Sequence, residues 1–494
     1  MSSPIGSLPD RPRSTLWVPS HLAGLARAHL SSPDAFPARL EKHRKLIVAL
    51  VGSVYWLLIF EGVLRKWLFP QWSRQLFFIR DPIVILVYVL VFAARTRLPR
   101  SNLFRIEWAL AVAGAGLCVI NLVAGSKLPA YFLLYGWRNY FLYMPLSFII
   151  ARYFNLWDLA QLAKRTLIVC IPMAALVLAQ LQAPYLAPIN AGLGDRPYQV
   201  QTTEYGVVRP PGPFTSDQGL TTFSASALAI ALAFWLLPRR SRPVGLPLLL
   251  ASTACTLICV GLSGSRTLML WSAVIIGGAL LGLFAIRSRM WFRASALVLL
   301  MLGAAAFLLP IIFPRAIEAF IARWTEAGAA ESQAYGEGGV FARLGYEATS
   351  FLRVISQTPS AGYGLGSCGN AAWEMGVREK VIFFRDQDER NAAETDWGRN
   401  ILELGPILGS IFIIFRLTFA ATLLRNGLRA TQWSDHPFPL MLALFISVLL
   451  IYWQITGNGT LNGYAWLFVG FSMAATSKAR RFQAYNSDPR FQRA

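Results

Sequence analysis

The stretch that decides the fold lies between Pro359 and Phe415. It reads PSAGYGLGSCGNAAWEMG (359–376), VREKVIFFRDQDERNAAETDWGRN (377–400) and ILELGPILGSIFIIF (401–415). The middle part carries too many charges to lie in lipid, whereas the apolar part after it opens a helix long enough to span a membrane. We expect the polar segment to fold back onto that helix and to place three carboxylates at the end of the helix that faces water. These are Glu394, Asp396 and Glu403.

The composition of the chain predicts an all-α polytopic membrane protein. Of its 494 residues 55% are apolar and 14% are charged, whereas soluble domains carry about 25% charged residues. Apolar runs near 20 residues recur along the chain, and each can cross ~30 Å of hydrocarbon. The five cysteines and four histidines form neither a disulfide framework nor a metal-ligand pattern, so no metal and no cofactor are expected.

Twelve transmembrane helices are expected, nine of them in 46–314 and three in 398–478. Their ranges are 46–64, 76–94, 107–125, 131–151, 166–183, 219–238, 244–262, 267–285, 292–314, 398–424, 437–456 and 462–478. Alternate connectors are rich in arginine, and basic connectors face the cytoplasm. Both termini are therefore expected to be cytoplasmic, with a disordered tail at 1–45 and a second tail at 479–494. The net charge of +21 follows from the same bias, so nucleic-acid binding is not expected.

The long connector 315–397 faces the other side and has its own charge balance. It holds 8 Lys and Arg against 12 Asp and Glu, whereas the rest of the chain holds 38 against 13. The segments PRAIEAFIARW (314–324) and FARLGYEATSFLRVI (341–355) place apolar residues three and four positions apart, which predicts amphipathic helices. We expect this connector to form a lid over the mouth of the bundle.

Several basic residues break the charge rule for outward connectors. Arg209 lies in VVRPPGPF, where prolines and a glycine predict a rigid loop. Arg266 follows Ser-Gly-Ser at a helix start, where free backbone N–H groups and a guanidinium can bind an anion. Simpler interpretations stay open: a snorkelling arginine in a rigid turn for Arg209, and an interfacial arginine beside a helix cap for Arg266.

A second set of basic residues lies at the outer ends of the early spans. Arg65 and Lys66 follow Glu61, and Arg80 precedes Asp81; for these residues snorkelling to the interface is the alternative. Arg138 lies inside the fourth expected span, and an arginine within lipid faces a partner or a watery cavity. Together with Arg209 and Arg266, these side chains predict a site for phosphate groups, because guanidinium binds phosphate through a bidentate fork.

At these residues the chain resembles the O-antigen polymerase and O-antigen ligase superfamily of bacterial membrane glycosyltransferases, over about residues 200 to 478. The resemblance rests on Arg209, Gly212 and Phe214, on Ser265 and Arg266, on Pro359, Gly362, Gly364 and Gly366, and on the Glu-x-Gly of Glu403 and Gly405. The family has His-Asn about eleven residues before that last glycine. This chain has Glu394 there, which favours a polymerase-like branch over a standard ligase.

The resemblance implies metal-independent, inverting transfer of a glycan from undecaprenyl diphosphate at the periplasmic face of the inner membrane. The arginines would then hold the donor diphosphate, Glu394 would activate the acceptor hydroxyl as a general base, and Asp396 and Glu403 would assist. A helix cap is the alternative role for Glu394. The expected partners are the lipid-linked oligosaccharide and the bilayer, with a chain-length regulator and a flippase as further candidates.

Two other functions stay open at this point. An O-antigen ligase would pass the glycan to a lipid or a protein, and a flippase would move the same lipid-linked sugars without chemistry. A transporter typically shows inverted repeats or paired broken helices, and the sequence shows no matching halves. A subunit that assists assembly without catalysis would explain the acidic connector but not the arginines.

Overall fold

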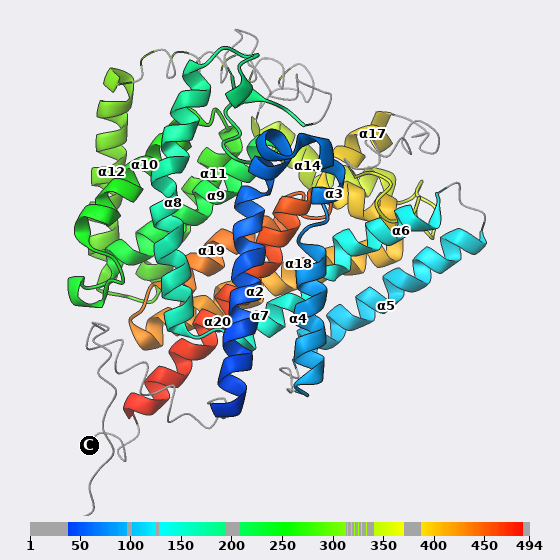
Figure 1. Ribbon diagram of the computed structural model, residues 1–494, viewed down its shortest axis with the longest axis horizontal. Helices are drawn as coiled ribbons and strands as arrows, with labels where there is room; N and C mark the ends of the chain where they lie inside the picture. Colours follow the sequence, from blue (N-terminus) through cyan, green and yellow to red (C-terminus); the bar gives the residue numbers. More distant parts are fainter. Residues whose placement is uncertain are drawn as a thin grey trace, which may run out of the picture.

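The computed structural model describes residues 38–95, 101–124, 128–193, 208–312, 340–369 and 387–487, with single positions between 313 and 339. Every element assigned in these ranges is a helix (Figure 1), which confirms the expected class. Most of the N-terminal tail and the expected helix 314–324 lie outside the described residues. The tail boundary is wrong in one respect, because α2 already begins at Ala38.

Eight helical stretches in these ranges are long and apolar enough to cross a membrane, so the chain is a polytopic membrane protein. They are Glu41–Leu68, Pro70–Ala93, Asn102–Val123 (α5), Leu156–Gln182 (α8), Asp217–Leu236 (α9), Arg266–Ala285 (α11), Met290–Ile312 (α12) and Asp396–Ser434 (α18). Two shorter apolar helices are α10 (Leu246–Leu262) and α19 (Phe438–Ile451). Twelve spans are therefore not confirmed.

The helices not yet labelled either make up the first two of these stretches, Glu41–Leu68 and Pro70–Ala93, or are shorter or more polar. They are the π-helix η1 (Leu64–Leu68) after α2 (Ala38–Val63), η2 (Pro70–Trp72), α3 (Ser73–Leu76) and α4 (Asp81–Ala93), then α6 (Ala130–Trp137), the π-helix η3 (Arg138–Leu142) and α7 (Met144–Tyr153), then η4 (Pro188–Asn190), η5 (Arg239–Ser241), α14 (Val340–Val354), α17 (Gln387–Glu394) and α20 (Gly459–Ser487). The run expected as one span at 131–151 is thus a helix interrupted by a π-turn that carries Arg138.

Helix α9 lies at the centre of the bundle. Nearly all of its residues are buried, and α8, α10, α11 and α19 pack around it. Its sequence TTFSASALAIALAF is rich in alanine, serine and threonine, and such small side chains let neighbouring helices approach closely inside a membrane. The N-terminal end of this enclosed helix therefore presents Asp217 and Gln218 to the interior of the protein.

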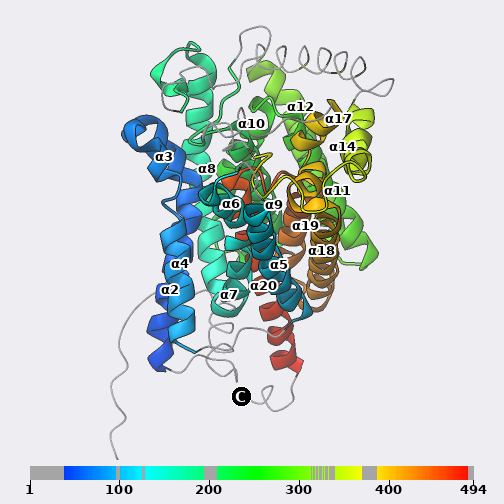
Figure 2. The same cartoon turned by 90° about the vertical axis from the view of Figure 1, so that its right-hand side faces the viewer.

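The two ends of the bundle differ. In Figures 1 and 2 the start of α2 and the end of α20 lie at one end, whereas α3, α14 and α17 lie at the other. Helix α14 matches the second amphipathic helix expected from the sequence, and Val354 on its apolar face packs into a small core with Ala392, Ile401 and Ile413. The described part of the expected lid therefore docks on α18.

Helix α18 is a sharp helical hairpin. Gly405 has φ 80° and ψ 167° in its middle, and Pro406 follows. Asp396 and Arg416 form an ion pair, although 20 positions of continuous helix would separate them by ~30 Å. A Cβ added to Gly409 would lie 2.6 Å from the backbone oxygen of Asn400. The part before Gly405 therefore folds back along the part after it, within the range expected as one span at 398–424.

The glycine-rich loop 359–369 fits between this hairpin and α6. Tyr363 N donates to Leu402 O at 2.7 Å, next to the break in α18. On the other side, a Cβ on Gly136 would lie 2.1 Å from Leu365 O. Gly366 has φ +84°, a conformation that side chains with a Cβ rarely adopt. The glycine-rich loop therefore contacts the helix that carries Glu403.

Candidate functional site

The connector between α19 and α20, residues 452–458, joins the elements that carry the candidate residues. It is non-helical backbone inside an apolar bundle, and such backbone is tolerated only where protein surrounds it or where it lines a cavity. Gln454 donates to Glu394 O of α17, and Asn458 Nδ2 donates to Gln218 Oε1 of α9 at 2.9 Å. Gly459 O, the first residue of α20, accepts from Arg80 Nη1 at 3.1 Å. One short segment thus touches α17, α9 and α4.

Three arginines and two carboxylates form a buried cluster beside this connector. Glu61 pairs with Arg65 Nη1 at 3.0 Å and with Arg80 Nε at 2.7 Å. Asp81 accepts a bidentate pair from Arg138, at 2.7 and 2.8 Å. All five residues are at most 9% exposed. Because arginine stays protonated in proteins, the cluster holds one positive charge more than its carboxylates neutralise.

The side chains of Arg80 and Arg138 converge on Gly459. A Cβ built on Gly459 would lie 3.4 Å from Arg80 Nη2, 3.6 Å from Arg138 Nη1 and 3.5 Å from the ring of Phe77. These are ordinary van der Waals distances, so an atom fits at this point between the two guanidinium groups. We call this point the Gly459 notch. The guanidinium carbons of Arg65 and Arg138 lie 5.2 and 5.3 Å from the Phe77 ring centroid, which fixes both side chains around the notch.

Lys66 lies next to this cluster but makes a different contact. Its Nζ donates to Gly212 O at 3.0 Å. Gln180 binds the same glycine by accepting from Gly212 N at 2.8 Å and donating to Gly212 O at 3.1 Å. Lys66 therefore holds the proline-rich loop of Arg209 rather than pointing at the Gly459 notch. Arg209 itself pairs with Asp217 at 2.6 Å, at the start of α9.

The structure brings Arg266 to the same end of α9. Ser265 caps α11 by accepting from Leu268 N, and Thr221 Oγ1 donates to Ser265 Oγ at 3.2 Å. Arg266 follows that cap and is half-buried. Of the six basic residues expected at a phosphate site, Arg80 and Arg138 line the Gly459 notch, and Arg65 lies against the ring of Phe77 beside them. Arg209 and Arg266 lie around the N-terminal end of α9.

The three candidate carboxylates have different environments. Glu394 is exposed and is the last residue of α17. It does not start the helix that carries Glu403, and it is not the cap of that helix, because Thr395 Oγ1 accepts from Gly398 N. Glu403 is 1% exposed, and its Oε1 accepts from Cys368 N at 2.7 Å. Glu403 therefore ties the glycine-rich loop to α18.

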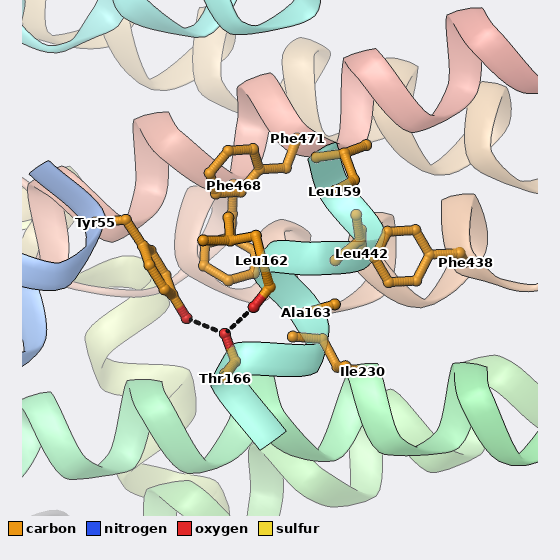
Figure 3. Close-up of a pocket in the computed structure, with 10 residues that line it drawn as sticks. All are labelled: Tyr55, Leu159, Leu162, Ala163, Thr166, Ile230, Phe438, Leu442, Phe468 and Phe471. Carbon is orange, nitrogen blue, oxygen red and sulfur yellow. Dashed lines mark hydrogen bonds between the residues drawn. The ribbon is translucent and has the colours of Figure 1, made fainter. Parts of the chain in front are cut away.

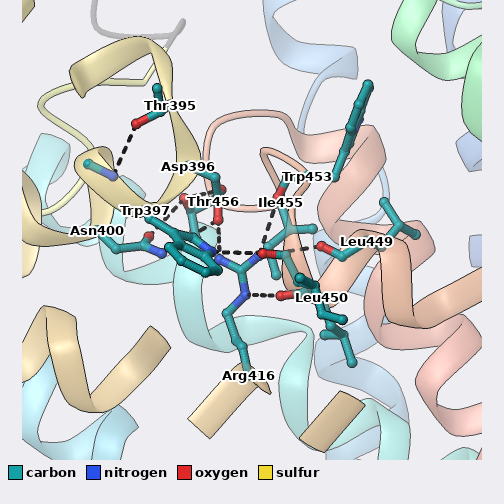
Figure 4. A network of polar contacts seen from close by, with 12 residues as sticks. Thr395, Asp396, Trp397, Asn400, Arg416, Leu449, Leu450, Trp453, Ile455 and Thr456 are labelled. Carbon is teal, nitrogen blue, oxygen red and sulfur yellow. Dashed lines mark hydrogen bonds and ion pairs between the residues drawn. The ribbon is translucent and has the colours of Figure 1, made fainter. Parts of the chain in front are cut away.

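Asp396 is enclosed by a polar network at the base of the α18 hairpin (Figure 4). It pairs with Arg416, and both side chains are 1% exposed. Arg416 also donates to Leu450 O at 3.0 Å and to Leu449 O and Trp453 O at 3.3 Å. These contacts engage Asp396 with a buried guanidinium. The role expected for Asp396, assisting at the reaction centre, thus has little geometric support.

Sequence reasoning missed several residues of this region. Arg399 binds Ala393 O through two nitrogens at 3.0 and 3.2 Å, while its Nη1 packs against Gly457 and has no hydrogen-bond partner among the described residues. Tyr140 donates to Asn400 Oδ1 at 3.1 Å. The clearest signal in the sequence was the polar, glycine-containing run QITGNGTLNG at 454–463, which interrupts two apolar helices.

A separate apolar cavity lies away from the arginine cluster (Figure 3). It is lined mainly by aliphatic and aromatic side chains, and its hydroxyl groups, Tyr55 and Thr166, bond each other at 2.7 Å. None of the residues that line it carries a charge. Among the described residues no group of three or more His, Cys, Asp or Glu is arranged to hold a metal ion.

Comparison with known proteins adds no family to this description. No family model matches the chain, and neither a curated protein nor a solved structure matches it.

Proposed function

We propose that this protein is a membrane glycosyltransferase that polymerises polyprenyl-diphosphate-linked oligosaccharides into a surface polysaccharide or exopolysaccharide. The observation that carries the proposal is the uncompensated positive charge of the buried cluster around the Gly459 notch. Each arginine has a carboxylate partner, but Glu61 is shared by two of them. A buried excess of charge is costly, and a diphosphate would supply the missing negative charge. A lipid-linked diphosphate has its phosphates at the membrane surface and its tail in lipid, so it fits a site built from membrane helices.

The chemistry assigned to the site is a single displacement at the anomeric carbon. The acceptor hydroxyl attacks this carbon, the bond to the diphosphate oxygen breaks, and the leaving oxygen takes the electron pair. Arg80 and Arg138 stabilise the charge that develops on the diphosphate. Glu394 takes the proton of the acceptor hydroxyl, since it alone of the three candidate carboxylates is exposed. We assign this reaction to the periplasmic face of a bacterial inner membrane.

The connector limits the distance between base and diphosphate site. Gln454 binds Glu394 O. Gly459 follows Gln454 by five positions, and a chain of that length spans at most ~18 Å. A sugar unit of the acceptor fits into such a gap. Glu403 serves in this scheme by holding the glycine-rich loop, and Asp396 by holding the hairpin.

The test is polymerisation by purified protein in nanodiscs with lipid-linked repeat units as the sole substrate. We expect a ladder of polymer and release of polyprenyl diphosphate. Arg138→Gln should abolish both products, whereas Arg239→Ala, which removes an exposed arginine of η5, should abolish neither. Polymer formation by Arg138→Gln at the wild-type rate would refute the assignment.

A flippase is the second candidate, and the break in α18 favours it, because discontinuous helices line substrate sites in transporters. The same nanodisc experiment separates the two functions, since a flippase yields no polymer. A ligase-type enzyme would yield polymer only after a lipid or protein acceptor is added.

A further inference from the structure

Arg416 has four acceptors, and three of them are backbone oxygens. These belong to Leu449 and Leu450 in the last turn of α19 and to Trp453 in the connector. The last carbonyls of a helix have no partner within the helix. A guanidinium offers five N–H donors in a fixed fork, so one side chain satisfies these oxygens and Asp396 together. The arrangement depends on arginine, because lysine offers three donors at a single nitrogen.

The same contacts fix the start of the connector. Trp453 O is held by Arg416, and Thr456 Oγ1 donates to Asp396 Oδ1 at 3.4 Å and to Asn400 Oδ1 at 3.3 Å (Figure 4). Three residues later the chain reaches Gly459, whose carbonyl accepts from Arg80. A displacement of the end of α19 would therefore be passed along a short, anchored segment to the Gly459 notch.

We infer that Arg416 is a positioning residue that sets the place of Gly459, and hence the geometry of the anion site between Arg80 and Arg138. The inference rests on the anion site of the proposed function but does not require that the protein forms a polymer. Arg416 touches no substrate in this scheme. It acts through the connector, which it holds at one end while Arg80 holds the other.

The experiment measures binding of inorganic pyrophosphate to the full chain in nanodiscs, with thermal unfolding recorded in parallel. Arg416→Lys keeps the charge opposite Asp396 but loses most backbone contacts, so we expect a lower unfolding temperature, because buried oxygens lose their donors, and an affinity of the folded protein lower by about tenfold. Arg425→Lys is the matched control, because Arg425 lies exposed on the same helix, and it should bind as the wild type does.

A double-mutant comparison with Gly459 distinguishes a positioning role of Arg416 from a general loss of structure. If Arg416 acts through the notch, Arg416→Lys and Gly459→Ala together should lower affinity by less than the product of their separate effects, because coupled sites are not additive. Fully multiplicative effects, or an Arg416→Lys protein with wild-type affinity, would overturn the inference. Should Arg416→Lys fail to fold, the pair Asp396→Leu with Arg416→Met replaces it. A folded double variant with wild-type affinity for pyrophosphate would also overturn the inference.

The two proposals fail in different ways. If the protein forms no polymer from lipid-linked units, the proposed polymerase is refuted. If Arg416→Lys still weakens pyrophosphate binding to that protein, the inference about Arg416 stands. Polymer formation that is insensitive to Arg416→Lys removes the inference alone.

Discussion

The substitution Gly459→Ala is the sharpest probe of the anion site, because it changes one methyl group. The added Cβ would lie 3.4 Å from Arg80 Nη2 and 3.6 Å from Arg138 Nη1, so it fits without a clash. Gly459 is the first residue of α20, and replacing glycine by alanine at a compatible helical position stabilises a protein by about 0.4–1 kcal/mol. The folded state should therefore be retained.

Anion binding should fall, because the methyl group would occupy the place of a phosphate oxygen. Hydrogen bonds to charged groups contribute about 1.5–3 kcal/mol each, and two guanidinium groups face the notch. Loss of one such bond lowers affinity by about 10- to 100-fold, since ~1.4 kcal/mol corresponds to a factor of ten.

Calorimetry with inorganic pyrophosphate in nanodiscs measures this change. Gly52→Ala is the matched control, because a Cβ on Gly52 of α2 meets no atom within 4 Å. Wild-type pyrophosphate affinity in Gly459→Ala would show that no anion occupies the notch, and our assignment of the cluster would then fail.

Three further predictions test other parts of the scheme. Glu394→Gln should slow glycosyl transfer in the nanodisc assay by about 10²–10⁴-fold while pyrophosphate affinity stays unchanged, and turnover near the wild-type rate would place the base elsewhere. Gly136→Ala should destabilise the protein by about 1–3 kcal/mol in thermal unfolding, because its Cβ would meet Leu365 O at 2.1 Å; Gly116→Ala, in open space, is its control and should not. In a cysteine-free background, Ala348→Cys on α14 should react with an impermeant thiol reagent in spheroplasts and Trp433→Cys should not; the opposite pattern would invert the topology.

The class of protein could be predicted from the sequence, because the length of an apolar run is a local property. The amphipathic helix at 340–354 followed from a similar local pattern. The sequence also carries a local signal for the hairpin in α18. Gly405-Pro406 stands inside an apolar run, and a proline disfavours helical backbone at the residue before it.

The partners of the charged residues could not be predicted in the same way. The sequence predicts a role for Asp396 at the reaction centre, because nothing near it in the sequence shows that Arg416 lies against it once the helix reverses. The π-helices that carry Arg65, Lys66 and Arg138 also show no hydrophobic periodicity in the sequence by which they could be recognised. Such contacts depend on how the chain reverses in space, and only the structure supplies that.

The closing of the α18 hairpin also has a consequence for how the protein is made. Asp396 and Arg416 lie within 21 consecutive residues, so the nascent chain already contains both charges before α19 has been synthesised. A helical hairpin that enters the bilayer with its acid and base already joined carries no net charge at that point, which lowers the cost of insertion. The backbone oxygens of α19 bind the guanidinium of Arg416 only after α19 has been synthesised. The order of synthesis thus matches the order in which Arg416 acquires its partners.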